Sequence, residues 1–311
     1  HEENLNRAVS EEDINAANEA FEKRFEELKT DFQKQQEERF DKTFEKFKQD
    51  AINNAEKKIR EKKRRAIEND VKARLRGFAR TIPSFIMAYG DENLRLSNFE
   101  KYTPDDVFEE VTGINIPSFK YLRDGGCYCG PDGVTEEFEG GLFNEVVFDQ
   151  SIQLFLQKRD ELANYFEDHE EDIFDYIPNQ QTNQIFTPKW VVQEMVDQLE
   201  EENEGIFDDS SKTFADLYMK SGMYITEIVK RLFNSEVIKE EFPDDHQRIK
   251  HILENQVYGL APTEIIYRIA LRYIFGNLDD SISRKNFKCL DAQVYAEDGT
   301  LEEKLNEIFE D

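Results

Sequence analysis

The N-terminal quarter of the chain contains no helix-breaking residue, since no glycine occurs before Gly77 and no proline before Pro83. Glutamate, lysine, glutamine and arginine dominate this stretch, and all four favour the α-helix. We therefore expect residues 1–80 to form a long amphipathic helical region, either unbroken or broken once over residues 30–36. Its apolar residues recur at steps of four and three, which places them on one helix face: first Phe21, Phe25, Leu28 and Phe32, then Phe40, Phe44, Phe47 and Ala51. Phenylalanine on this stripe favours packing against another domain over a leucine-type coiled coil.

Charge is distributed unevenly along the chain. The formal net charge is −28, which argues against a surface that wraps nucleic acid as a whole. Between Glu56 and Arg80, however, eleven bases face only four acids. A solvated helix face, or a surface that docks the chain's own acidic parts, is one interpretation of this cluster. Contact with a DNA backbone is the other, and it assigns that contact to Lys62, Lys63, Arg64 and Arg65.

Composition excludes several classes of protein. No stretch of some 18 consecutive apolar residues occurs, so no membrane-spanning segment is predicted. The first 20 residues carry acids and no apolar core segment, unlike a signal peptide. Three cysteines do not make a disulfide framework, and we expect a reducing, cytoplasmic environment. A mean hydropathy of −0.76 indicates a long polar helical region beside a smaller core.

Residues 81–180 are predicted to form a second helical domain. The apolar stretch before Gly90 is expected to be a helix with Pro83 near its start and Gly90 as its stop signal. Further helices are expected from Pro104 to Gly113 and over residues 142–168.

A glycine-rich segment from Gly125 to Gly141 contains two of the three cysteines, Cys127 and Cys129. A structural zinc ion takes about four protein ligands, and the remaining candidates, Cys289 and His169, are far away in sequence. A plain hairpin loop is the simpler interpretation, and we predict no metal site here.

The last part of the chain, residues 181–311, follows a polar linker over residues 178–183 that we take as the main domain boundary. Thr187 and Pro188 are a good N-cap and first-turn pair for a short amphipathic helix. Strands are predicted over residues 213–218, 256–261 and 286–291, and helices begin near Met223 and Pro262. This order predicts an α/β fold with a parallel sheet and right-handed crossovers.

Candidate ligand-binding residues stand where these predicted strands end. Asp216, Glu264 and Asp291 lie at or just past three carboxyl ends, where parallel sheets bind their ligands. Gly222 lies at the start of a helix, whose free backbone N–H groups suit a small anionic group. The competing interpretations are an ordinary strand–helix unit around Gly222 and, for Glu264, a first-turn acid stabilised by the helix dipole.

Four short motifs follow one another in this region. Residues 183–188 have the sequence NQIFTP and precede a VV…MVD pattern, and the loop from Asp216 to Gly222 comes next. Val257–Gly259 opens a third motif and Cys289–Ala292 a fourth. In order and spacing the set resembles the amino-type, N6-adenine DNA methyltransferases of restriction–modification systems. The closer resemblance is to large single-chain restriction enzymes, in which a helicase-like motor and a helical coupler precede the methyltransferase.

This resemblance implies a function for each part of the chain. Residues 81–180 are then coupler-like, and residues 181–311 are the N-terminal part of an incomplete Rossmann-like methyltransferase domain that binds S-adenosyl-L-methionine. Double-stranded DNA and upstream helicase and nuclease domains of the same parent chain are the expected partners. The cofactor-binding residues implied by the family are Phe186, Thr187, Asp216, Lys220, Ser221, Gly222, Glu264 and Asp291. For Phe186, which would cover the adenine face, a helix-staple residue is the alternative.

The chain also departs from the family pattern at several positions, and these departures bear on its function as much as the matches do. Lys220 stands among residues that replace the small ones of the cofactor loop, and Ala261 stands where the family commonly has a ribose-binding acid. The N/D-P-P-Y/F motif that grips a flipped-out base is absent, since the chain contains no Pro-Pro pair. We therefore expect a fragment truncated at both ends, with no catalytic residues and inactive alone.

A function of a different class explains the same departures. The chain is then a non-catalytic helical scaffold or coupling module, whose silent Rossmann-like domain no longer binds the cofactor. Under this hypothesis the phenylalanine stripe and the basic cluster are the working parts, and they dock a helicase motor or DNA.

Overall fold

The computed structural model describes residues 11–129, 135–167, 169–178, 185–276 and 278–309. Within these ranges the side chains of residues 11–14, 17, 37, 64, 67, 68, 70–76, 128, 129 and 136 are not described. Contacts divide the chain into two compact units, His1–Val71 and Lys72–Asp311. A further division near residue 180 stays a prediction. Among the described helices, none combines the length and the apolar character that crossing a membrane requires.

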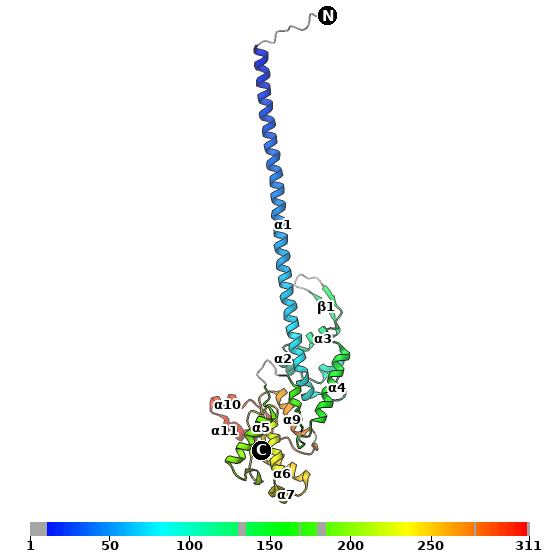
Figure 1. Ribbon diagram of the computed structural model, residues 1–311, viewed down its shortest axis with the longest axis vertical. Helices are drawn as coiled ribbons and strands as arrows, with labels where there is room; N and C mark the ends of the chain where they lie inside the picture. The colour runs from blue at the N-terminus through cyan, green and yellow to red at the C-terminus, as the bar shows by residue number, and fades with distance from the viewer. Residues whose placement is uncertain (1–10, 130–134, 168, 179–184, 277, 310–311) are drawn as a thin grey trace. The chain divides into compact units, whose positions relative to one another are not determined.

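Helix α1 runs without interruption from Glu11 to Tyr89 (Figure 1). It has no break over residues 30–36, and it ends where Gly90 donates its N–H to the Ile86 carbonyl. The prediction of a separate helix that starts near Pro83 is wrong, because Pro83 lies inside α1.

Burial explains why the helix continues through this proline. A proline inside a helix removes one hydrogen bond and crowds the carbonyl four residues earlier, which costs about 3 kcal/mol. Phe85, Ile86 and Met87 follow directly and are at most 2% exposed. Burying three such side chains contributes about 1.5–3 kcal/mol each, which exceeds the cost.

The first unit is the α1 segment up to Val71. Its phenylalanine stripe is exposed, with side chains between 52% and 70% accessible from Phe21 to Phe47. Within the stripe the rings of Phe21 and Phe25 stack at 6.3 Å, as do those of Phe40 and Phe44 at 6.2 Å. The stripe therefore has no covering partner among the described residues.

Short helices surround the last turns of α1 in the second unit. They are η1 (Leu96–Lys101), α2 (Asp105–Thr112), α3 (Ile116–Asp124), α4 (Glu145–Glu161) and η2 (Ile173–Tyr176). Phe78 contacts Phe99, Phe108 and Phe119, and Phe85 contacts Phe99 and Phe108, through ring pairs 5.2 to 6.2 Å apart. All five rings are at most 1% exposed, so aromatic packing holds these helices together.

The glycine-rich segment forms a two-stranded antiparallel hairpin of β1 (Gly126–Cys129) and β2 (Thr135–Phe138). Phe138 packs against Tyr121 of α3, with ring centroids 5.2 Å apart. The predicted hairpin over this segment is thus present.

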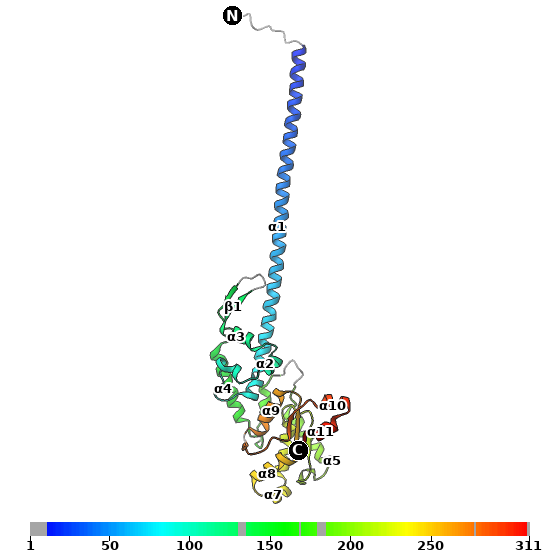
Figure 2. The same ribbon diagram turned by 180° about the vertical axis from the view of Figure 1, so that it is seen from behind.

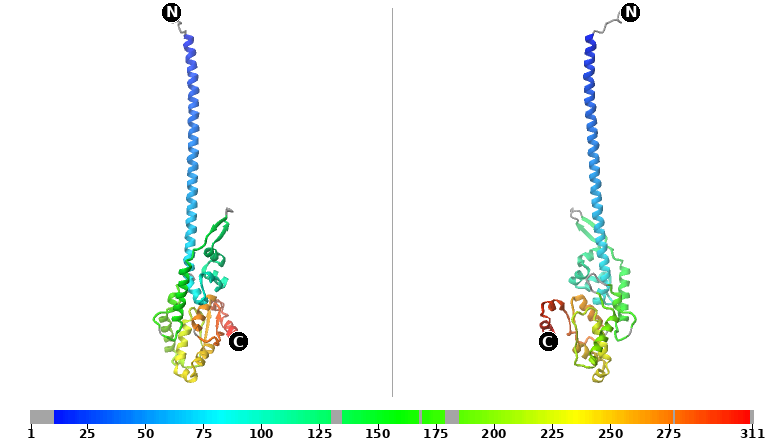
Figure 3. Two further views of the ribbon diagram at one scale, coloured as in Figure 1. Left: turned by 90° about the vertical axis from the view of Figure 1, so that its right-hand side faces the viewer. Right: turned by 60° about the vertical axis from the view of Figure 1, so that its left-hand side comes forward.

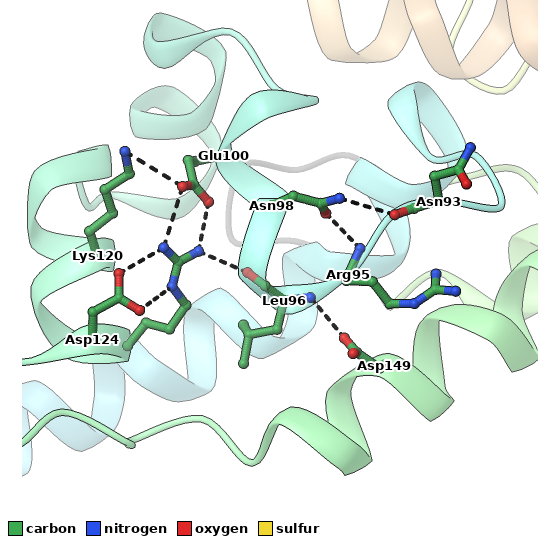
Figure 4. Close-up of polar contacts among 9 residues, drawn as sticks. Asn93, Arg95, Leu96, Asn98, Glu100, Lys120, Asp124 and Asp149 are labelled. Carbon is green, nitrogen blue, oxygen red and sulfur yellow. Dashed lines mark hydrogen bonds and ion pairs between the residues drawn. The ribbon is translucent and has the colours of Figure 1, made fainter.

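A polar clamp joins η1 to α3 and α4 (Figure 4). The Arg123 guanidinium donates to the Leu96 carbonyl at 2.8 Å and to Glu100 at 2.7 Å, while Asp149 accepts the Leu96 N–H at 2.7 Å. The side chains of Arg123 and Glu100 are only 11% and 9% exposed. Burial raises the pKa of Glu100, but the hydrogen bond from Arg123, a backbone hydrogen bond and the positive charges of Arg123 and Lys120 together outweigh it, and the net pKa is lowered.

The α/β part contains a parallel sheet with the strand order β3-β4-β5. The strands are β3 (Phe214–Asp216), β4 (Val257–Ala261) and β5 (Phe287–Cys289), with Asp216 beside Gly259 and Ala261 beside Cys289. The prediction of an α/β fold with a small parallel sheet is confirmed, although the strands are shorter than predicted.

The connections between these strands are helical. From β3 to β4 the chain passes through α6 (Met223–Asn234), α7 (Glu236–Glu241), α8 (Asp245–His251) and the π-helical turn η4 (Ile252–Gln256). Helix α9 (Glu264–Phe275) leads from β4 to β5. Both α6 and α9 bury isoleucines at helical spacing, such as Ile225 and Ile228 or Ile265 and Ile269. Figure 2 shows α7 and α8 next to each other.

The remaining elements flank this sheet. Helix α5 (Lys189–Glu202) packs against α6, and η3 (Ile206–Asp208) precedes β3. Helices α10 (Ala292–Asp298) and α11 (Leu301–Phe309) follow β5 and contact each other, as the red segment of Figure 3 shows. One continuous apolar core extends from Phe78 to Phe287, and Tyr273 of α9 contacts Phe174 of η2 at 4.9 Å.

Candidate functional site

The loop between β3 and α6 is held against the sheet by Met219. Its N–H donates to the Leu260 carbonyl at 2.7 Å, and its side chain is fully buried. The sulfur occupies the space over Gly259, because a Cβ atom added there would lie 2.7 Å from it. Main-chain and side-chain contacts thus fix this loop on β4.

Helix α6 begins as the sequence predicts. Gly222 adopts φ 85°, a left-handed conformation that glycine reaches without strain. The Ser221 hydroxyl is buried and accepts the Met223 N–H at 3.2 Å. The first turn of α6 leaves further backbone N–H groups without intrahelical partners, as every helix start does.

Asp216, at the carboxyl end of β3, is the acid of this loop. Its carboxylate accepts the Tyr218 N–H at 3.1 Å. Burial raises the pKa of Asp216, and the hydrogen bond from Tyr218 opposes this. Lys220 extends over the Tyr218 ring, 5.7 Å from its centroid, so its ammonium lies on an aromatic face.

A cavity of about 800 Å³ lies beside the start of α6. Phe186, Thr187, Trp190 and Met223 line it, which brings the FTP segment together with the first residue of α6. The acids Glu170, Asp172 and Asp175 and the side chains of His169, Phe174, Lys189 and Gln193 also line it. Aromatic rings and carboxylates around one cavity suit an organic cation that carries an apolar part.

Tyr224 links Thr187 to Asp216. Burial raises the pKa of Tyr224, a hydrogen bond from Thr187 lowers it, and the Asp216 carboxylate raises it further. The Tyr224 hydroxyl itself donates to the Met195 sulfur at 2.7 Å. Through this tyrosine, residues from the FTP segment, from β3 and from α6 lie in one neighbourhood.

The FTP segment starts its helix differently from the prediction. Helix α5 begins at Lys189, Pro188 is its N-cap, and no side chain caps it. The N-cap is therefore Pro188 and not Thr187, because the helix begins one residue later than predicted. Phe186 packs against Phe174, with ring centroids 4.8 Å apart.

The candidates at the ends of β4 and β5 form a second group. Glu264 accepts a hydrogen bond from Arg268 at 2.7 Å. Burial raises the pKa of the Cys289 thiol, and the neighbouring Glu264 carboxylate raises it further. Asp291 caps α10 by accepting the Gln293 N–H at 3.1 Å, and Ala261 is fully buried.

Sequence reasoning missed several residues of the cavity. Trp190 stands two residues after Pro188, and Tyr224, which does not line the cavity itself, stands two residues after Gly222, so their proximity to the motifs was the available signal. Asp172 and Phe174 come from η2, and no sequence pattern connects them to α6. Burial raises the pKa of Asp172, which also caps η2 through the Phe174 N–H.

The basic candidates lie on α1 in the first unit. Lys62, Lys63 and Arg65 are exposed, whereas the side chain of Arg64 lies outside the described residues. Elsewhere in the described part of the chain, no three His, Cys, Asp or Glu side chains gather as metal ligands.

Comparisons with protein-family models, with curated proteins and with solved structures gave no match.

Proposed function

We propose that this chain is the cofactor-binding and coupler part of a DNA adenine-N6 methyltransferase within a restriction–modification enzyme. The observation that supports it best is the cavity beside α6. It is lined both by Phe186 and Thr187 of the FTP segment and by Met223 at the start of α6. Two segments that are far apart in the sequence, residues 186–187 and residue 223, thus line one cavity, which supports a ligand site of the kind that the resemblance implies.

The residues present offer groups for both ends of S-adenosyl-L-methionine, the amino-acid end and the adenine. The N-terminus of α6 suits its carboxylate, the Asp216 carboxylate suits its ammonium, and Phe186 offers a ring for the adenine. When bound, this group supplies a methyl on a sulfonium. The protein residues would hold and orient it, with Asp216 at the carboxyl end of β3, outside the lining of the cavity itself.

Calorimetry with S-adenosyl-L-methionine tests the proposal. We expect measurable binding that Asp216→Asn weakens about 10- to 100-fold, since a hydrogen bond to a charged group contributes about 1.5–3 kcal/mol. Asp209→Asn is the matched control, because it removes the same charge before β3 and leaves the loop intact. No heat of binding, together with a melting temperature that the cofactor does not change, would overturn the assignment.

A non-catalytic coupling module is the second candidate function. The packing of Met219 on Gly259 and the bond between Glu264 and Arg268 support it, because both fill positions near the strand ends without a ligand. The exposed bases on α1 would then contact DNA. A salt titration tests this, since neutralising Lys62, Lys63, Arg64 and Arg65 should lower the slope of log K against log salt by up to about 3–4. An unchanged slope would exclude this surface.

A further inference from the structure

The first unit presents an apolar seam along α1 that the proposed function does not use. The seam positions recur about every 3.7 residues, slightly more than the 3.6 residues of a helical turn, so the seam drifts slowly around the helix. They are Phe25, Leu28, Phe32, Gln36, Phe40, Phe44, Phe47, Ala51, Ala55, Ile59, Lys63 and Ala66, of which all but two are apolar. Every one of these side chains is exposed.

The seam is symmetric about the bond between Glu45 and Lys46. Reflection about this point carries every seam position onto another seam position. Large side chains then meet smaller ones, because Phe25 maps onto Ala66, Phe32 onto Ile59 and Phe40 onto Ala51. Only Phe44 and Phe47, at the centre, meet as two rings. A two-fold partner requires this symmetry, whereas an unrelated partner does not.

Charge distinguishes the two orientations of such a pair. Residues 25–45 carry seven acids and four bases, whereas residues 46–66 carry three acids and nine bases. An antiparallel pair places each acidic half beside a basic half. A parallel pair places the basic halves side by side, where they repel each other.

We propose that this seam is a self-association surface, and that its occupant is the same segment of a second copy of the chain running antiparallel. The paired length from Phe25 to Ala66 is about 60 Å, at 1.5 Å per residue. A repeat longer than 3.6 residues gives the pair a right-handed supercoil. Such a pair covers the phenylalanine rings that the single chain leaves in water.

Disulfide trapping on the full chain tests the orientation. The native cysteines are first replaced, as Cys127→Ser, Cys129→Ser and Cys289→Ser. In this background Gln36→Cys and Ala55→Cys are made as separate proteins, because positions 36 and 55 map onto each other. An antiparallel pair gives a cross-linked dimer only when the two are mixed. Cross-linking of either protein alone indicates a parallel pair and overturns the proposal.

Sedimentation velocity over a concentration series tests the surface itself. We expect a dimer whose dissociation constant rises at least tenfold in Phe44→Glu. Gln49→Glu is the matched control, since it adds the same charge on the opposite helix face, and it should change the constant less than threefold. Circular dichroism checks that both variants keep their helix content. A chain that stays monomeric up to about 100 µM, or equal effects of both variants, would refute the proposal.

Discussion

The packing of Met219 on Gly259 makes a quantitative prediction about the loop between β3 and α6. A Cβ atom at position 259 would lie 2.7 Å from the Met219 sulfur and 2.9 Å from Cδ1 of Phe287. Gly259→Ala is therefore expected to destabilise the fold by about 1–3 kcal/mol through overpacking. Met219→Ala removes a fully buried side chain, and should cost about 2–5 kcal/mol.

The double variant separates this contact from independent effects. With alanine at position 219 the sulfur is gone, and the new methyl at position 259 has space on one side. The double variant should then be more stable than the sum of the single changes by about 1–3 kcal/mol, the range of coupling between residues in contact. Urea unfolding followed by near-ultraviolet circular dichroism measures all four proteins. Additivity within about 0.5 kcal/mol would show that the loop does not rest on β4 in this way.

Three further expectations concern the core, the site acid and the polar clamp. Phe78→Ala should cost about 3–5 kcal/mol by urea unfolding, whereas Phe21→Ala, at a 70% exposed position outside the seam, should stay within about 0.5 kcal/mol. Because burial raises the pKa of folded Asp216, its contribution to stability is complete below the unfolded pKa and is lost as pH rises through the folded pKa. Asp216→Asn should therefore gain stability relative to wild type as the pH rises above the unfolded pKa of about 4, and a pH-independent difference would contradict this sign. Arg123→Met leaves the nearly buried Glu100 beside Lys120 alone and should lower the unfolding free energy by about 3 kcal/mol, with Arg95→Met as a control that changes it by less than about 1 kcal/mol.

Most of the helices and strands that could be predicted from the sequence were predicted from local periodicity. The alternation around β3, α6, β4 and α9 is visible because each element buries its own apolar residues at a characteristic spacing. The passage of α1 through Pro83 was not predictable in this way. It depends on packing against Phe99 and Phe108, which lie in later helices, and no local pattern shows that such burial exceeds the cost of a proline.

In the candidate site too, the residues placed by local patterns could be predicted from the sequence, and those placed by tertiary packing could not. Gly222 and Asp216 could be placed from the sequence, because a strand end and a helix start fix their positions. The hydrogen bond between Glu264 and Arg268 could also be predicted, since the two residues stand four apart on a helix. The positions of the cavity acids at η2 could not be predicted from the sequence, because these acids approach α6 only through tertiary packing of the phenylalanine and tyrosine rings.

Alanine stands at position 261 where the family commonly has a ribose-binding acid. Whether this argues against cofactor binding depends on whether Glu264 can take the place of that acid. Its bond to Arg268 joins side chains that are 36% and 51% exposed, and such exposed helix pairs contribute only about 0.3–0.5 kcal/mol. A hydrogen bond from a ligand hydroxyl to a carboxylate contributes more, about 1.5–3 kcal/mol. The pair can therefore open at little cost when a better donor arrives. Glu264, the first residue of α9 and three residues after the end of β4, remains available to a ribose, so the missing acid at position 261 does not by itself favour a silent domain.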